Sequence, residues 1–359
     1  MSLALALGRR GLGNTWPNPA VGAVIVRPED GAPVIVGRGW TQPGGRPHAE
    51  VEALRLAGAA ARGATMYVTL EPCSHYGKSP PCADAIIAAG IARVVSAIED
   101  PNPEVAGAGH ARLRAAGIAV EVGLCAEEAR RAHAGHIRRM RDGRPHVTLK
   151  LALSADGKAG LAGRRTVAIT GDAVRARVHR LRAMNDAILV GIGTVLADDP
   201  QLTCRLPGME KLSPVRVVLD RQLRLPPASA LATSARQTPV WVVAGPGVSS
   251  DAAQVLARQG VEVLHAPAQA GRLDLAAVLP LLAERGITRL MVEGGPIVAA
   301  AFVAADLVDE AVLFRSPKVI GPDGIDALEG LPLEALTGKL ALLAREPIGE
   351  DGVEFFARA

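Results

Sequence analysis

The run VGAVIV at residues 21–26, followed by VIVGRGW at residues 34–40, decides the fold of the first part of the chain. Both runs are rich in β-branched residues, and a segment containing Pro, Asp and Gly separates them. This pattern predicts a β-hairpin. Helical patterns then alternate with strand-length apolar runs, the helices at 48–61, 83–89 and 109–116 and the strands at 65–70, 93–97 and 118–122. A hairpin followed by αβ units predicts an α/β domain with a mixed sheet and flanking helices.

A second α/β domain is predicted after a helical, basic segment at residues 127–144, which we interpret as a solvated connector. The segment ends in DGRP at residues 142–145, and because Gly and Pro interrupt the chain there, we place the boundary between residues 143 and 144. Strand-length apolar runs recur at 147–153, 187–190, 215–219, 240–244, 261–264 and 290–292. Their alternation with helical stretches predicts a doubly wound domain with a largely parallel sheet.

Composition excludes several classes of function. The 359 residues, 49% hydrophobic and 21% charged, are typical of a globular chain of two domains. A formal charge of +4 and 3% aromatic residues offer little to attract or stack nucleic acid, so we expect no such partner. The longest run without a charged residue, 11–26, is too short to cross a bilayer, so no membrane association is expected. Four cysteines and no secretory signal pattern favour the cytoplasm.

The residues that carry chemistry lie in PHAE at residues 47–50 and EPCSHYGKSPPC at residues 71–82. One imidazole and two thiolates are a natural ligand set for Zn²⁺ and leave a fourth tetrahedral position for water, as in catalytic sites. Zinc lowers the pKa of that water to about 7, and Glu50 is placed to carry its proton to a leaving amine. Because residues two apart do not share a helix face, we expect His48 and Glu50 in the first helical turn, where Pro47 suits a helix start.

The His-x-Glu and Pro-Cys…Cys pattern resembles the zinc-dependent nucleobase and nucleoside deaminases. The resemblance implies His48, Cys73 and Cys82 as zinc ligands and Glu50 as the proton shuttle. Eight residues separate the two cysteines here, where the general deaminase pattern has two. We interpret His75 as a group that contacts the substrate or the metal ligands, because another ligand would fill the open position. The alternative to a zinc site is a redox-inert or regulatory cysteine pair with a surface histidine. The other two cysteines, Cys125 and Cys204, are expected to be small core residues.

Motifs along the whole chain resemble the bifunctional deaminase/reductase family of riboflavin biosynthesis, in which the long cysteine spacing is usual. The motifs are PNPAVG at 17–22, HAEV at 48–51, EPCSH at 71–75 with PPC at 80–82, DPNP at 100–103, VAG at 105–107, KLALSADGK at 150–158, LADDP at 196–200, LT at 202–203 and VEGGP at 292–296. The resemblance implies a zinc-dependent, cytidine-deaminase-like domain at residues 1–143. It implies an NADPH-dependent, dihydrofolate-reductase-like domain at residues 144–359.

The resemblance also implies the reactions. Zinc hydroxide would deaminate 2,5-diamino-6-ribosylamino-4(3H)-pyrimidinone 5′-phosphate, and NADPH would then reduce the ribosyl group to a ribityl chain. By positional match, Lys150 is implied as catalytic. The implied substrate residues are Asn18, Ala49, His75, Thr166, Arg182, Leu202, Arg205 and Glu293. The implied cofactor residues are Ala152, Ala168, Thr170, Thr194, Asp198, Gly294, Gly295 and Pro296.

Physical arguments support some of these assignments. Arg182 and Arg205 suit a phosphate, because a guanidinium presents a planar fork of donors. The turn at residues 294–296 follows a predicted strand and opens a predicted helix, so its backbone N–H groups could meet a phosphate. Ala168 departs from the family, which often carries a tryptophan at that position.

Two other functions remain open at this stage. One is a single-activity zinc deaminase of nucleosides or RNA with a degenerate second domain. The other is a zinc-stabilised binding protein, although a structural zinc site does not require Glu50. The expected partner is a small phosphorylated pyrimidine, and the family also suggests a homo-oligomer.

Overall fold

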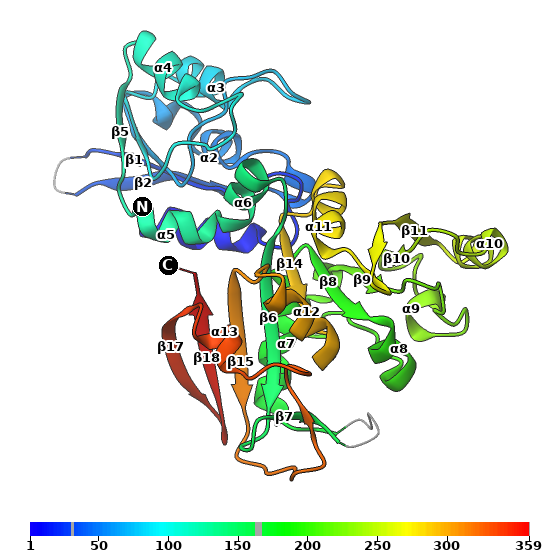
Figure 1. Ribbon diagram of the computed structural model, residues 1–359. Helices are drawn as coiled ribbons and strands as arrows, with labels where there is room; N and C mark the ends of the chain where they lie inside the picture. The colour runs from blue at the N-terminus through cyan, green and yellow to red at the C-terminus, as the bar shows by residue number, and fades with distance from the viewer. Residues whose placement is uncertain (30–31, 162–166, 359) are drawn as a thin grey trace. The chain divides into compact units, whose positions relative to one another are not determined.

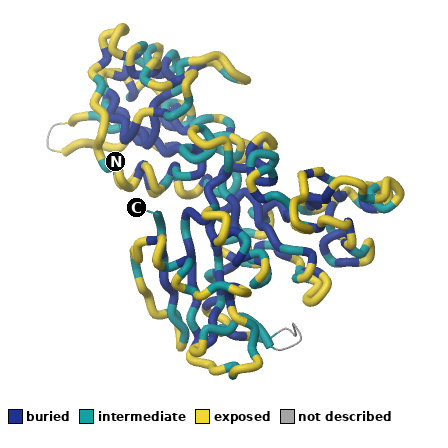
Figure 2. The backbone as a smooth tube through the Cα atoms, viewed as in Figure 1, coloured by how far each residue is buried: buried dark blue, intermediate teal, exposed yellow. Residues whose placement is uncertain are grey.

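The chain forms two compact units, Met1–Arg144 and Pro145–Ala359, in a computed structural model that describes residues 1–29, 32–161 and 167–358 (Figure 1). The boundary predicted from the sequence lies one residue before this division. Within each unit the strands are mostly buried, while the outer faces of the helices are exposed (Figure 2).

The first unit is built on a five-stranded mixed sheet with the order β2-β1-β3-β4-β5. Strand β1 pairs antiparallel with both β2 and β3, and β3, β4 and β5 are parallel. The predicted hairpin, mixed sheet and flanking helices are therefore confirmed. The elements are α1 (Ser2–Gly8), β1 (Gly22–Arg27), β2 (Val34–Trp40), α2 (Ala49–Ala57), β3 (Thr65–Val68), α3 (Cys82–Ala88), β4 (Arg93–Ser96), α4 (Ala108–Ala115), β5 (Ala119–Val122), α5 (Ala126–Ala132) and α6 (Ala134–Asp142).

Helix α2 lies directly against β2 because two glycines of that strand leave room for its backbone. A Cβ at Gly37 would lie 2.3 Å from the carbonyl oxygen of Ala53, and one at Gly39 would lie 2.4 Å from that of Ala49. Successive residues of a strand point to opposite faces, so these two glycines clear the same face. This close approach fixes the start of α2, where His48 and Glu50 lie.

The basic segment predicted as one helix at 127–144 is two helices, so that prediction is wrong in detail. The break falls at His133, whose ring nitrogen Nε2 lies 3.0 Å from the Thr69 hydroxyl in the interior. His133 and, three residues further on, His136 are both buried, with 2% and 7% of their surface exposed.

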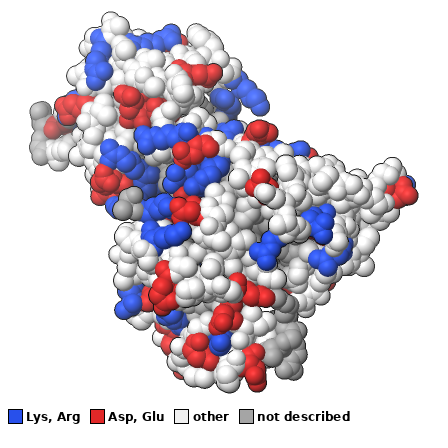
Figure 3. All heavy atoms as spheres, in the orientation of Figure 1, with Lys and Arg blue, Asp and Glu red and all other residues white. Residues whose placement is uncertain are grey.

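Arginines gather over α5 and α6 with acidic side chains among them, such as the Arg138–Asp142 pair (Figure 3). The outer face is therefore solvated, as predicted. The inner face packs on the core of the first unit through residues such as Ala129 and Ile137, so the two helices are part of that unit and not a separate connector.

The second unit contains a nine-stranded sheet with the order β11-β10-β9-β8-β14-β6-β15-β18-β17. The first seven of these strands are parallel, and β18 and β17 are antiparallel additions at one edge. The largely parallel sheet is confirmed. The antiparallel edge was not predicted, because ALLAREPI at residues 341–348 lacks a strand pattern and is mostly exposed (Figure 2).

Helices cover both faces of this sheet, with α7 and α12 on opposite sides (Figure 1). The elements are β6 (His146–Leu153), β7 (Lys158–Gly160), α7 (Asp172–Ala183), β8 (Ala187–Gly191), α8 (Ile192–Asp198), β9 (Val215–Leu219), α9 (Ala230–Thr233), β10 (Val240–Ala244), α10 (Ser250–Arg258), β11 (Val261–His265), β12 (Ala268–Gln269), β13 (Arg272–Leu273), α11 (Leu275–Glu284), β14 (Arg289–Val292), α12 (Pro296–Ala304), β15 (Glu310–Arg315), β16 (Ile325–Asp326), α13 (Glu334–Thr337), β17 (Ala341–Ile348) and β18 (Asp351–Ala357).

The contact between α2 and β2 predicts that one methyl group added at Gly39 lowers the stability of the fold. Gly39→Ala should lower the free energy of unfolding by about 1–3 kcal/mol, because the new Cβ overlaps the backbone of α2. Gly160→Ala is the control, since no atom lies within 4 Å of a Cβ at that position. Urea unfolding of both variants measures the difference. Equal stabilities would show that α2 is not held by this contact.

Candidate active sites

Three potential metal ligands meet in the first unit. The ring nitrogen Nδ1 of His48 lies 3.3 Å from the sulfur of Cys82 and 3.6 Å from that of Cys73. All three ligand atoms lie within 4.8 Å of one another. One imidazole and two thiols at this separation fit a zinc ion with a fourth position left open.

Two helix starts and one loop create this arrangement. His48 is the N-cap of α2 and Glu50 lies in its first turn, which confirms the predicted position of the His-x-Glu pair. Cys82 is the first residue of α3, whereas Cys73 lies in the loop after β3. The backbone N–H of Cys82 donates to the Cys73 sulfur over 3.3 Å. The start of α3 carries partial positive charge, so this bond favours the thiolate of Cys73. The neighbouring Cys73 sulfur and burial raise the pKa of Cys82.

The surroundings lower the pKa of the Cys73 thiol and raise that of the Glu50 carboxyl. The neighbouring Cys82 thiol, together with His48, lowers the pKa of Cys73 to about 4 against the effect of burial. Burial raises the pKa of Glu50 to about 7, although the charge of His48 acts against this. Glu50 is only 3% exposed and contacts the Cys82 thiol. A carboxyl of this kind can both accept and release a proton near neutral pH.

The other residues predicted for this site surround the ligands. Asn18 donates its amide to the carbonyl of Gly45 over 2.8 Å, so it is tied to the loop that leads into α2. Ala49 is fully buried at the start of α2, and His75 is exposed in the loop between the two cysteines. Sequence reasoning missed Arg46, whose guanidinium lies 3.4 Å from Nε2 of His48 and also contacts the Ser79 hydroxyl.

The remaining cysteines stand apart from this centre. Cys204 is 1% exposed in the second unit, and Cys125 is half-buried against the core of the first. Both are free thiols, as a core role requires.

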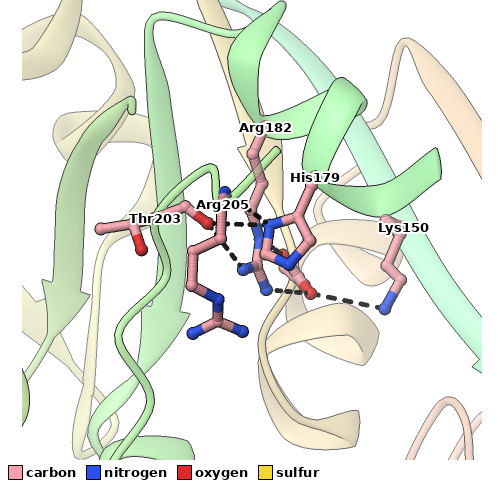
Figure 4. A network of polar contacts seen from close by, with 6 residues as sticks. Lys150, His179, Arg182, Thr203 and Arg205 are labelled. Atoms are coloured by element: carbon pink, nitrogen blue, oxygen red, sulfur yellow. Dashed lines mark hydrogen bonds and ion pairs between the residues drawn. The ribbon is translucent and has the colours of Figure 1, made fainter. Parts of the chain in front are cut away.

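In the second unit, a buried carboxylate is held between two cations (Figure 4). Arg182 donates to Glu293 through Nε over 2.9 Å and through Nη2 over 2.8 Å, and Nζ of Lys150 lies 3.5 Å from the same carboxylate. Parallel pairing of Val292 with Leu149 places the next residues, Glu293 and Lys150, side by side. Burial raises the pKa of Glu293, but the charges of Lys150 and Arg182 outweigh burial and lower it to about 2.

This network includes His179, which sequence reasoning missed. Its nitrogen Nδ1 lies 3.0 Å from the Thr203 carbonyl and 3.3 Å from the backbone nitrogen of Arg205. Arg182 donates to the same carbonyl over 3.1 Å (Figure 4). Burial and the charge of Arg182 lower the pKa of His179, which favours its neutral form. Its partners lie in a loop distant in sequence, so a lone histidine in a basic helix gave no signal.

The predicted residues of the loop at 199–205 differ in exposure. Leu202 is 4% exposed, its side chain packs in the core, and its φ is +57°. Arg205 is exposed and donates to the side chain of Gln201 over 3.0 Å.

The turn predicted for the cofactor lies between β14 and α12, as expected. A Cβ at Gly294 would lie 2.5 Å from Cα of Val190, and one at Gly295 would lie 3.2 Å from the Thr194 hydroxyl. The turn therefore touches the end of β8 and the start of α8, and Pro296 is the first residue of α12. A turn without side chains at the start of a helix fits the phosphate groups of a dinucleotide.

The other predicted cofactor and substrate residues lie around these elements. Ala152 is half-buried in β6, Thr170 is half-buried before α7, and Asp198 is exposed at the end of α8. Ala168 is exposed, and its carbonyl accepts a hydrogen bond from Lys318 over 3.0 Å. Thr166 lies outside the described residues.

Comparisons with known proteins assign a domain family to a stretch of each unit. A family model described as the cytidine and deoxycytidylate deaminase zinc-binding region matches residues 1–98, and the RibD C-terminal domain matches residues 145–353. The riboflavin biosynthesis protein RibD of Escherichia coli is 44% identical over 344 residues, which are 92% of this chain and 91% of that protein.

Solved structures also match this chain over its whole length. Acinetobacter baumannii RibD is 37% identical with a TM-score of 0.87, and 97% of its chain is covered. A diaminohydroxyphosphoribosylaminopyrimidine deaminase/5-amino-6-(5-phosphoribosylamino)uracil reductase from Thermotoga maritima is 35% identical with a TM-score of 0.84, also with 97% covered.

The fold and the two sites define an enzyme in which a zinc-binding deaminase region precedes a reductase domain. The chain belongs to the RibD family, the bifunctional deaminase/reductases of riboflavin biosynthesis. The resemblance stated from the sequence motifs is thus confirmed. Among the described residues, no helix combines the length and the apolar character needed to span a bilayer.

The charged network of the second unit predicts a pH-dependent contribution to stability. Because the pKa of Glu293 falls from its ordinary 4.5 to about 2, its ion pairs stabilise the fold fully above pH 4.5 and lose this effect as the pH falls towards 2. Glu293→Gln should cost about 3 kcal/mol at pH 7 and much less at pH 3. Urea unfolding at the two pH values measures this, with the exposed Glu334→Gln as control. A pH-independent loss would contradict the assignment.

Proposed function

We propose that the first unit deaminates 2,5-diamino-6-ribosylamino-4(3H)-pyrimidinone 5′-phosphate, with His48, Cys73 and Cys82 as the zinc ligands. The observation that carries this proposal is the convergence of three ligand atoms within 4.8 Å beside a buried glutamate. Bound there, zinc makes a water nucleophilic at neutral pH. We propose that residues 1–143 form the deaminase domain and residues 144–359 the reductase domain.

Glu50 is proposed to move the proton of this reaction. Its carboxyl lies on the first turn of α2, two residues from the histidine, and burial raises its pKa to about 7. It can therefore take a proton from the attacking water and deliver it to the departing amino group, which leaves as ammonia. Asn18, Ala49 and His75 are proposed to hold the pyrimidine, and the half-buried cation of Arg46 suits a phosphorylated substrate.

The second unit is proposed to reduce the ribosyl group at its C1 carbon, with NADPH as the hydride donor. The cofactor residues are the predicted set, with the turn at 294–296 and Thr194 at the phosphates. Lys150 is proposed to supply a proton to the opened, imine-like sugar, and Glu293 holds Lys150 and Arg182 in place. Arg182 and Arg205 are proposed for the substrate phosphate, with Thr166 and the backbone of Leu202 beside them. The complete Lys150–Glu293–Arg182 network speaks against a degenerate second domain.

One assay tests both halves. Zinc-loaded protein is incubated with the diaminopyrimidine phosphate and NADPH, and ammonia release and NADPH oxidation are followed together. We expect both, with oxidation dependent on deamination. Glu50→Gln should keep its zinc and lose ammonia release by at least about 100-fold, as expected when general acid–base catalysis is removed.

The complementary variant separates the two domains. Lys150→Met should release ammonia at the normal rate and oxidise no NADPH, because Lys150 belongs to the second unit. Substantial deamination by Glu50→Gln would remove that residue from the mechanism. No ammonia from the unaltered protein would reject the substrate.

We also propose that the enzyme is cytoplasmic and that it forms a homo-oligomer through strand β17. This strand is the edge of the nine-stranded sheet, and it exposes Leu342 by 49% and Leu343 by 52%. An apolar edge of this kind pairs readily with a second copy.

Light scattering after size-exclusion chromatography tests self-association. We expect a mass of at least twice 37.1 kDa, shifted towards the monomer by Leu342→Lys. Val122→Lys, at the exposed edge of the other sheet, should leave the mass unchanged. A monomeric unaltered protein would reject the proposal.

A further inference from the structure

Helix α4 packs against the segment that leads into the first of the two cysteines. A Cβ at Gly109 would lie 2.0 Å from the carbonyl oxygen of Pro72, so the helix backbone lies directly against the residue before Cys73. The fully buried carboxylate of Glu71 accepts hydrogen bonds from the backbone N–H groups of Asp100, Gly107 and His110, at 3.1, 2.9 and 3.1 Å. The start of α4 is therefore fixed to the segment that leads into the first cysteine.

A single side chain of α4 then reaches both cysteine segments. Arg112 donates through Nη1 to the carbonyl of Ser74 over 3.1 Å, and its Nη2 lies 2.7 Å from one carboxylate oxygen of Asp84 and 2.9 Å from the other. Ser74 directly follows Cys73, and Asp84 lies two residues after Cys82 in the first turn of α3. One guanidinium thus spans the two segments that carry the zinc-binding sulfurs.

We propose that Arg112 is a positioning residue of the zinc centre, which holds the Cys73 and Cys82 segments at the separation that the metal requires. The inference rests on the zinc ligands assigned under the proposed function. The eight residues between the cysteines include an exposed stretch, 75–78, whose one printed link to α3 is the Tyr76 hydroxyl, 3.5 Å from the carboxylate of Asp84. Arg112 contacts the same carboxylate at 2.7 and 2.9 Å. The Cys82 and Ala83 N–H groups bond to the Cys73 sulfur and carbonyl. Arg112 adds a side-chain link between the same two segments.

The geometry requires arginine. A guanidinium offers separate N–H groups in a rigid fork, so it can serve a carbonyl and a carboxylate at once, whereas an ammonium is a point charge. Groups that orient metal ligands typically change metal affinity 10- to 100-fold when they are replaced. A purely superficial ion pair would have almost no effect, and the Arg112 and Asp84 side chains are 40% and 29% exposed. The hydrogen bond from Arg112 to the Ser74 carbonyl distinguishes a positioning residue from a superficial ion pair, because it links Arg112 to the Cys73 segment as well.

Zinc release by the full chain tests the proposal without relying on catalysis. The zinc-loaded protein is mixed with a chromogenic chelator, and the rate of zinc transfer is measured for the unaltered protein, Arg112→Lys and Arg114→Lys. Arg114 is exposed on the same helix, so its substitution is the matched control. We expect Arg112→Lys to release zinc about ten times faster, Arg114→Lys to behave as the unaltered protein, and the melting temperatures of the metal-free proteins to agree.

Equal release rates for the two lysine variants would overturn the proposal. So would a faster release by Arg112→Lys that is matched by a lower melting temperature of the metal-free protein, because that result indicates general destabilisation. Should Arg112→Lys not fold, Asp84→Ala gives the same test, since it removes the α3 half of the contact and should accelerate release by a smaller factor. Tyr76→Phe, which removes the other hydrogen bond to Asp84, should leave the release rate unchanged.

A failure of the ligand assignment is recognised separately. If Cys82→Ser retains stoichiometric zinc, the metal is held elsewhere and the proposed function fails at that point. If Cys82→Ser loses zinc while Arg112→Lys releases it at the normal rate, the zinc site stands and only the role of Arg112 is rejected.

Discussion

The close approach of two helix starts is the constraint on which the first unit depends. Helix α2 begins next to His48 and carries Glu50, and α3 begins at Cys82. The metal ligands therefore meet only if the starts of the two helices lie close together, as they do here, with the ligand atoms within 4.8 Å of one another. The position of α2 is set by Gly37 and Gly39, which let its backbone lie on β2. Packing between a helix and a strand therefore determines the distances within the zinc centre.

Both units use a buried glutamate, and their surroundings give these two residues opposite properties. Glu50 is buried beside thiols, so its pKa rises to about 7 and it can exchange a proton. Glu293 is buried between Lys150 and Arg182, so its pKa falls to about 2 and it stays charged. The first environment suits a proton carrier and the second an anchor for cations. One carboxylate against two cations also leaves positive charge at the second site, as a phosphorylated substrate requires.

The sequence predicted those features that depend on local patterns. The β-branched runs at 21–26 and 34–40 became the hairpin, and the His-x-Glu pair was placed in the first turn of α2. Features that depend on contacts between distant residues were missed. The break at His133 and the exposed strand β17 follow from packing and edge pairing, and neither leaves a periodic pattern in the sequence.

The candidate sites divide in the same way. His48, Cys73 and Cys82 form a recognisable spacing, whereas the partners of His179 and Arg112 include backbone carbonyls, which no residue type identifies. Of the residues placed by family resemblance, Lys150, Arg182 and Glu293 lie together, and Thr166 is outside the described part of the chain.

The two arginines proposed for the phosphate of the second site, Arg182 and Arg205, differ in exposure and in their partners, so we expect them to have different roles. Arg182 is half-buried, and Glu293 and the Thr203 carbonyl are its partners, so its guanidinium is held in one orientation. Arg205 is exposed, and its side chain donates to that of Gln201 over 3.0 Å. If Arg182 moved to bind a ligand, Glu293 would lose both of its hydrogen bonds to that guanidinium, which is costly. If Arg205 turned to a phosphate, it would give up one hydrogen bond to the side chain of Gln201 at the surface, which costs little. Arg182 therefore supplies fixed positive charge, and Arg205 is the arginine that can turn to meet an incoming phosphate.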